Sequence, residues 1–167
     1  MGRAGRTKMG AVVPSGKPPT PYVLDSNAFD DLTRELGLIS LLAELLDAGE
    51  IELITNRLVH EELMRTGDDL KRFRFGLLQT DDGPLPFTIG RSALGGPDVI
   101  VSKEESDAIT AAKTSPKHQV DAYVLGLAVR HDAALVTADK RLANRAQEAN
   151  VEVLTGRELL DRLGLFL

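Results

Sequence analysis

The sequence predicts an α/β fold in which a mainly parallel sheet is covered by helices on both faces. Short apolar runs suited to buried strands alternate along the chain with longer segments whose apolar residues recur at helical spacing. The clearest run, at residues 133–137, is followed closely by an acid. Strands that alternate with helices pair in parallel, and parallel sheets are buried on both faces, so this pattern favours one α/β domain.

The composition describes a globular domain without a sulfur-based metal site. A chain of 167 residues, 43% of them hydrophobic and 27% charged, is long enough to bury one core. It has no cysteine and 3 histidines, which excludes disulfides and leaves oxygen as the ligand for any metal. There is no apolar run of membrane-spanning length and no secretory signal, so we expect a cytoplasmic protein that does not enter membranes.

The chain begins with a segment that has almost nothing to bury. Residues 1–20 combine glycines, prolines and cations, which predicts a disordered basic arm before a domain over residues 21–167. The first strand is expected at residues 22–24. It ends at Asp25, and Ser26 or Asn27 can cap the helix that follows.

The next elements repeat the strand and helix alternation. Leucines between residues 38 and 46 recur at helical spacing, and Gly49 supplies a C-terminal stop. Residues 51–54 form the second expected strand, after which Thr55 or Asn56 starts a helix that carries Glu61 and Glu62. A further helix is compatible with residues 71–78.

Periodicity weakens in the middle of the chain. Glycines and prolines predict a long loop over about residues 81–101, with a short extended piece at 87–89. Ser102 and Glu105 have the spacing of a capping box, which predicts a helix through Ala112.

The C-terminal third predicts two more strands. Ser115 and Pro116 provide a cap and a first-turn proline for a nearly all-apolar helix over residues 117–130, in which Asp121 is the only acid. The strand at 133–137 and Asp139 come next, and a polar helix leads to a last strand at 151–154. Thr155 caps the final helix.

Four acids are candidates for one site at the carboxyl edge of this sheet. Asp25 and Asp139 follow strand ends, and the helices that carry Glu62 and Asp121 can each place one side chain over the same edge. Clustered carboxylates repel by roughly 4 kcal/mol per pair at 4 Å when the effective dielectric constant is about 20. Either raised pKa values or a hard cation such as Mg²⁺ or Mn²⁺ must offset that repulsion. A cation held in this way can activate water against a phosphodiester.

Each acid also has an ordinary structural explanation. Asp25 and Asp139 can be helix caps, and Glu62 can be a solvated helix residue, with Glu61 as the alternative acid. Glu62 is preferred because it flanks the buried side of its helix. An unpaired carboxylate such as Asp121 in an apolar helix is costly, and its position is the hardest to explain without a function.

A nucleic-acid substrate would need a local basic rim, because the net charge is −5. The cations nearest the predicted site are the candidates for contact with RNA: Lys113, Lys117, Lys140 and Arg141. Each is equally compatible with an ordinary solvated surface.

At these acids the sequence resembles the PIN-domain ribonucleases, the family that includes VapC-type toxins of toxin–antitoxin pairs. Residues 22–27, Tyr-Val-Leu-Asp-Ser-Asn, are similar to the family's opening strand, and residues 53–63 are similar to its strand-to-helix segment. Residues 121–142 match best, with a buried helix, a turn and a strand between the two aspartates. The resemblance covers about residues 21–160, although the segment 67–100 has no counterpart.

The resemblance implies a three-layer α/β/α sandwich around a five-stranded, mainly parallel sheet, and Mg²⁺- or Mn²⁺-dependent cleavage of RNA. Asp25, Asp121 and Asp139 would hold the metal, with Glu62 as the fourth catalytic acid. Ser26, Asn27 and Thr137 would support them, the last two by hydrogen bonds. A homodimer and an antitoxin protein are the implied partners.

Three functions remain open from the sequence. They are an endoribonuclease toxin, a PIN nuclease that processes RNA, and a PIN-like binding module without turnover.

Overall fold

The computed structural model describes residues 16–87, 92, 96–113, 115 and 118–165, and its core is a parallel five-stranded sheet. The strand order is β3-β2-β1-β4-β5. The strands are β1 Thr20–Leu24, β2 Ile51–Thr55, β3 Asp81–Asp82, β4 Ala134–Val136 and β5 Val153–Leu154. The predicted α/β fold with a parallel sheet is confirmed.

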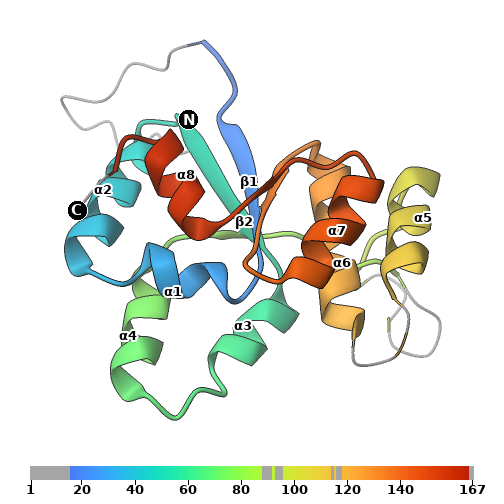
Figure 1. The fold of residues 1–167 in the computed structure, drawn as a ribbon, viewed down its shortest axis with the longest axis horizontal. Coiled ribbons are helices and arrows are strands. Elements are labelled where there is room, and N and C mark those ends of the chain that lie inside the picture. The colour runs from blue at the N-terminus through green and yellow to red at the C-terminus, as the bar shows by residue number, and fades with distance from the viewer. Residues whose placement is uncertain (1–15, 88–91, 93–95, 114, 116–117, 166–167) are drawn as a thin grey trace.

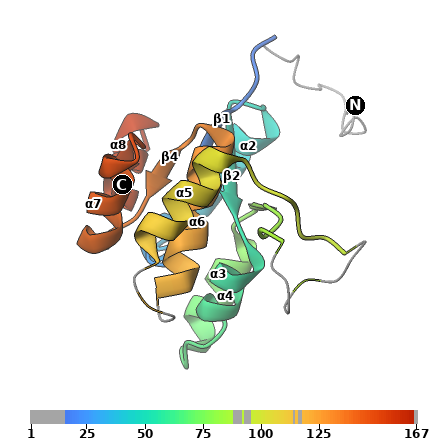
Figure 2. The ribbon, with the colours of Figure 1, turned by 90° about the vertical axis from the view of Figure 1, so that its right-hand side faces the viewer.

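Helices cover both faces of this sheet. Within the described residues they are α1 Ala28–Leu32, α2 Leu36–Asp47, α3 Arg57–Leu63, α4 Asp69–Leu77, α5 Lys103–Ala112, α6 Gln119–His131, α7 Lys140–Glu148 and α8 Gly156–Arg162. Helices α5, α6 and α7 contact one another on one side of the strands, whereas α1 contacts α4 and α8 on the other (Figure 1). Figure 2 views the molecule from the side of α5 and α6. The expected three-layer sandwich is therefore observed.

The core lies between these layers and is built from the central strands. Val23 and Leu24 of β1 and Leu135 and Val136 of β4 are fully buried. Helix α6 packs on both strands, and its residues 122–128 are all buried. The prediction that this helix is enclosed on most sides is confirmed, because its apolar residues face the sheet on one side and α5 and α7 on others.

The chain changes direction across the sheet between β1 and β4. β1 leads to β2 and β3 on one side, whereas β4 and β5 are added on the other. The two central strands pair through Leu24 and Val136, and the backbone N–H of Asp25 extends the pairing by donating to the carbonyl oxygen of Val136 at 3.0 Å. In open parallel sheets the crevice beyond the carboxyl ends of such a pair is where ligands bind.

The middle of the chain differs from the sequence prediction. The edge strand β3 lies at the start of the predicted loop, where Asp81 and Asp82 pair with the end of β2. The two residues are exposed acids without any apolar pattern, so nothing in the sequence marks them as a strand. The extended piece expected at 87–89 lies mostly outside the described residues, although the N–H of Phe87 donates to the carbonyl oxygen of Val99.

Several predicted helix starts also need correction. The side chain of Ser102 caps α5 as expected, but Glu105 does not complete a capping box, because its carboxylate binds Arg130 at 2.8 and 2.9 Å. Helix α6 starts at Gln119, later than predicted, and the expected cap at Ser115 is wrong since His118 occupies the N-cap position. Residues 116–117 lie outside the described part of the chain.

The N-terminal arm is described only in part. Residues 1–15 lie outside the described structure, and Thr20, which was assigned to the arm, is already the first residue of β1. Among the helices that the structure describes, none has the length and apolar character needed to cross a bilayer.

Candidate active site

Asp25 is the most deeply buried of the four acids. It directly follows β1, and only 3% of its surface is exposed. Its Oδ1 accepts from the backbone N–H of Ser26 at 2.8 Å, and its Oδ2 accepts from the hydroxyl of Thr137 at 2.8 Å and from Nδ2 of Asn27 at 3.2 Å. Burial raises the pKa of Asp25; the hydrogen bonds from Thr137 and Ser26 oppose this rise, and the charges of Glu62 and Asp139 reinforce it.

The side chains of Asn27 and Thr137 join the ends of the two central strands. Asn27 occupies the N-cap position of α1, but its side chain makes no cap hydrogen bond there. Its Oδ1 accepts instead from the backbone N–H of Ala138 at 2.8 Å. The hydroxyl of Thr137 donates to Asp25 and accepts from the backbone N–H of Asp139 at 3.0 Å. One network therefore fixes both aspartates.

Asp139 has the structural role that the sequence left open. It is the N-cap of α7, where its Oδ1 accepts from the backbone N–H groups of Arg141 and Leu142 at 2.9 and 3.2 Å. The cap does not exclude a second role, because only Oδ1 takes part in these two bonds. Asp25, by contrast, is not a cap: its side chain binds Ser26 and Thr137, and α1 begins three residues later.

Asp121 lies in the first turn of α6 and is influenced by all three other acids. Its pKa is raised to about 6, first by burial and then by the charges of Asp25, Asp139 and Glu62. Arg141, whose Nη1 lies 3.9 Å from Oδ2 of Asp121, opposes this rise. Four acids from four segments therefore share one electrostatic environment.

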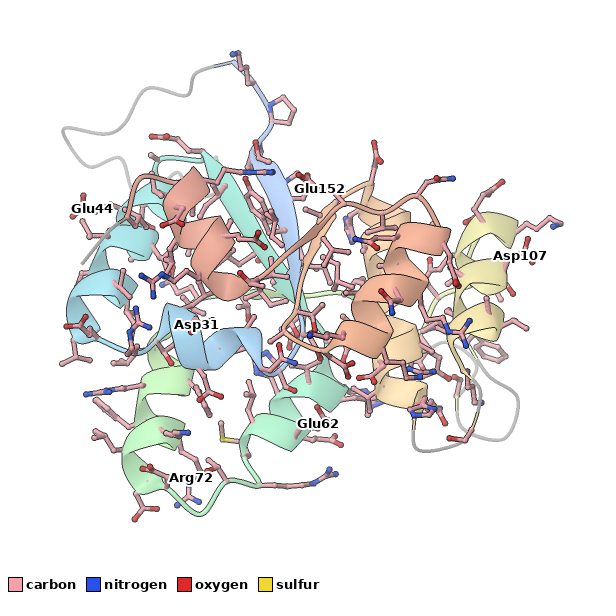
Figure 3. All side chains as sticks on the ribbon, in the orientation of Figure 1. Asp31, Glu44, Glu62, Arg72, Asp107 and Glu152 are labelled. Atoms are coloured by element: carbon pink, nitrogen blue, oxygen red, sulfur yellow. The ribbon has the colours of Figure 1, made fainter. Side chains whose placement is uncertain are left out.

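Glu62 rather than Glu61 belongs to this environment. Glu62 is a half-buried residue of α3, labelled in Figure 3, and its charge raises the pKa values of both Asp25 and Asp121. Glu61 is exposed and is not among the charges that act on either aspartate. The difference follows from helix geometry, since neighbouring residues point about 100° apart.

The four acids do not form a closed cage. Among the described residues, no three acidic or histidine side chains come close enough together to hold a metal ion by themselves. Both oxygens of Asp25 and Oδ1 of Asp139 are held instead by backbone N–H groups, by the hydroxyl of Thr137 and by the side-chain amide of Asn27. Mg²⁺ commonly binds through one or two carboxylates and keeps several waters. An oxygen-only donor set at an open edge fits this mode.

The four cations that were candidates for RNA contact differ in their surroundings. Lys113 and Lys140 are exposed, and Lys117 lies outside the described residues. Arg141 is instead built into the protein: its Nη2 donates to the carbonyl oxygen of Ala112, and its Nη1 approaches Asp121. Sequence reasoning missed this role. An available signal was the position of a cation in the first helical turn, which the helix dipole disfavours.

Comparisons with known proteins bear on the fold. No family model matches the sequence, and no curated protein does. Among solved structures, a PilT N-terminus domain protein from the hyperthermophilic archaeon Sulfolobus solfataricus P2 aligns over 86% of this chain and 92% of that chain, with 15% identity and a TM-score of 0.50. The chain has the fold of a PilT N-terminus (PIN) domain.

Two further solved structures align less closely. FitAcB from Neisseria gonorrhoeae shows 14% identity over 81% of this chain and 98% of that chain, with a TM-score of 0.44. VapBC2 from Rickettsia felis, bound to a DNA fragment from its promoter, shows 12% identity over the same shares, with a TM-score of 0.45. The assignment of the PIN fold rests on the archaeal structure, and it agrees with the resemblance seen in the sequence.

Proposed function

We propose that this chain is a Mg²⁺- or Mn²⁺-dependent endoribonuclease in which Asp25, Glu62, Asp121 and Asp139 are the catalytic acids. The observation that carries the proposal is the pair of hydrogen bonds by which Thr137 joins Asp25 to Asp139 at the switch point of the sheet. Burial and the charges of the three other acids also raise the pKa of Asp121 to about 6. Carboxylates that destabilise one another in this way are suited to a hard divalent cation. Asp25, Asp121 and Asp139 are its proposed ligands.

The protein's own contribution to the reaction is to place and hold charge. When bound, the metal supplies positive charge that activates water and stabilises the phosphodiester as its bond breaks. Thr137 and Asn27 hold Oδ2 of Asp25, so this carboxylate is positioned before substrate arrives. Asp121, with a pKa of about 6 without a cation, is partly protonated near neutral pH, so cation binding there releases a proton.

Cleavage of a labelled single-stranded RNA in Mg²⁺ or Mn²⁺ tests the proposal. Replacing Asp25 or Asp121 by Asn removes a ligand charge without changing shape, and we expect cleavage to fall at least ~100-fold. Glu62→Gln and Glu61→Gln form a matched pair on one helix. The first is expected to lose activity and the second to keep it. Undiminished cleavage by folded Asp121→Asn protein would refute the site.

We also propose that this nuclease is the toxin of a toxin–antitoxin pair and that it forms a homodimer, both following the resemblance to VapC-type proteins. An exposed apolar stripe on α4 supports contact with a protein partner: Leu70, Phe73 and Leu77, at helical spacing, are 57%, 59% and 41% exposed. We assign the stripe to the antitoxin. Light scattering on the purified chain reports the homodimer separately.

Overexpression distinguishes the toxin from an RNA-processing nuclease. A toxin arrests growth, and co-expression of the antitoxin relieves the arrest, whereas cells that grow normally favour RNA processing. Phe73→Ser is expected to weaken co-purification with the antitoxin while RNA cleavage persists. A binding module without turnover is expected to cleave no RNA.

A further inference from the structure

Arg141 contacts two acids of the candidate active site and the end of a neighbouring helix. Its backbone N–H donates to Oδ1 of Asp139 at 2.9 Å, and its Nη1 lies 3.9 Å from Oδ2 of Asp121. Its Nη2 donates to the carbonyl oxygen of Ala112, the last residue of α5. One residue of α7 therefore touches two of the proposed metal ligands, although its side chain is only 29% exposed.

The guanidinium is held in this place by the ends of two helices. A cation in the first turn of α7 is disfavoured by the dipole of its own helix, whereas a cation at the C-terminal end of α5 is favoured. The planar guanidinium can serve the Ala112 carbonyl and the Asp121 carboxylate together, because its N–H donors form a rigid fork. Arg141 is thus a fixed positive charge beside Asp121 rather than a mobile surface cation.

A fixed positive charge beside a carboxylate has two opposite effects on a metal site. It offsets the repulsion among the four acids, which helps to keep them together when no cation is bound. It also weakens the attraction of that carboxylate for a divalent cation, because two positive charges then share one carboxylate.

We propose that Arg141 is a built-in countercharge that offsets the charge of Asp121 when no cation is bound and competes with the divalent cation for that carboxylate. The inference rests on the proposed metal-dependent function and adds a residue that limits metal affinity. The inference predicts that metal affinity rises, rather than falls, when Arg141 is replaced. Removing Arg141 tightens metal binding, whereas removing a residue that only supports the structure weakens it.

Calorimetric titration with Mn²⁺ at pH 7.5 tests the inference without measuring activity. We expect Arg141→Gln and Arg141→Met to bind Mn²⁺ about 3- to 10-fold more tightly than the original chain, since screening by solvent limits the effect of one nearby charge. Arg141→Lys keeps the charge but not the fork that fixes it, so its Mn²⁺ affinity is expected to lie between those of the original chain and the Gln variant. Circular dichroism establishes that each variant is folded, and the Met variant serves if the Gln variant is not.

Arg145→Gln is the matched control. It removes the same charge one turn further along α7, where Arg145 pairs with Glu148 at 3.3 Å and not with the four acids. Its Mn²⁺ affinity should stay close to that of the original chain. Unchanged or weaker binding by the folded Arg141 variants overturns the inference. Absence of Mn²⁺ binding by the original chain is a different result, because it overturns the proposed function itself.

Discussion

Each of the four acids is positioned near the carboxyl ends of the strands by different local contacts. Asp25 is fixed by Ser26 and Thr137, and Asp139 is fixed as the cap of α7. Asp121 and Glu62 are carried by helices that pack against the core. These placements leave like charges near one another, which opposes folding and favours cation binding. The mutual repulsion of the four acids is therefore expected to lower the stability of the metal-free protein.

Replacing Asp121 by Asn measures this cost through its pH dependence. The pKa of Asp121 is about 6 in the folded protein, against an ordinary value of 3.8. The folded state therefore binds the proton more tightly than the unfolded state does, and the free energy of unfolding falls as pH rises from about 4 through 6. In Asp121→Asn this decrease in the free energy of unfolding is absent, because the Asn side chain does not titrate. In chelator we expect this variant to be more stable than the original chain at pH 7.5 and nearly equal at pH 4.

Chemical denaturation at several pH values makes the comparison, with Glu61→Gln, an exposed acid outside the site, as the control. The free energy of unfolding of the control should change with pH in the same way as that of the original chain. A constant difference between Asp121→Asn and the original chain at every pH would contradict the assignment.

Replacing Thr137 tests whether its hydroxyl group holds Asp25 and Asp139 in place. Thr137→Val keeps the shape but removes the hydroxyl that donates to Asp25 and accepts from the N–H of Asp139. The loss of these buried bonds should cost about 1–3 kcal/mol of stability and weaken Mn²⁺ binding. Thr137→Ser keeps the hydroxyl and should retain Mn²⁺ affinity. Equal Mn²⁺ affinities for the Val and Ser variants would argue against the network.

Helices α5 and α6 pack closely together, and they are joined by a partly buried ion pair. Glu105 of α5 is 1% exposed and binds Arg130 of α6 through both carboxylate oxygens. Arg130 also donates to the carbonyl oxygen of Pro84 at 2.7 Å, which ties the segment after β3 to both helices. Gly126 allows the close approach, because a Cβ there would lie 2.7 Å from Ile109.

Removing Glu105 is expected to weaken this packing strongly. Glu105→Ala leaves the Arg130 guanidinium without its partner, so we expect a loss of about 3 kcal/mol in the free energy of unfolding. Asp107→Ala, on the same helix, breaks only the exposed pair with Lys103 and should have a small effect. Denaturant titration compares them. Similar losses in the free energy of unfolding for both variants would show that the burial of Glu105 does not determine how much its ion pair stabilises the fold.

The elements that sequence reasoning located are those with their own apolar signal. Strands β1, β2, β4 and β5 carry buried apolar residues, and their existence was predicted correctly. β3 was missed because it consists of two exposed acids that become a strand only by pairing with β2. The prediction that Glu105 completes a capping box was also wrong, because its carboxylate binds Arg130, 25 positions away in the sequence.

At the scale of the whole molecule, the candidate site lies at the carboxyl ends of the strands, at the topological switch point of the parallel sheet. The candidate acids come from segments after β1 and β4 and from helices α3 and α6, so chain topology alone gathers them. The sequence could predict this meeting because strand ends are readable from apolar runs. It could not predict that Arg141 reaches the end of α5, because that contact depends on how the helices on one face pack together.

Diffraction from a crystal soaked in Mn²⁺, recorded where Mn²⁺ scatters anomalously, tests the central claim most directly. We expect an anomalous peak at the carboxyl ends of the strands, beside Asp25, Asp121 and Asp139. A peak elsewhere, or none at the edge at millimolar Mn²⁺, would contradict the claim that these acids serve a common cation.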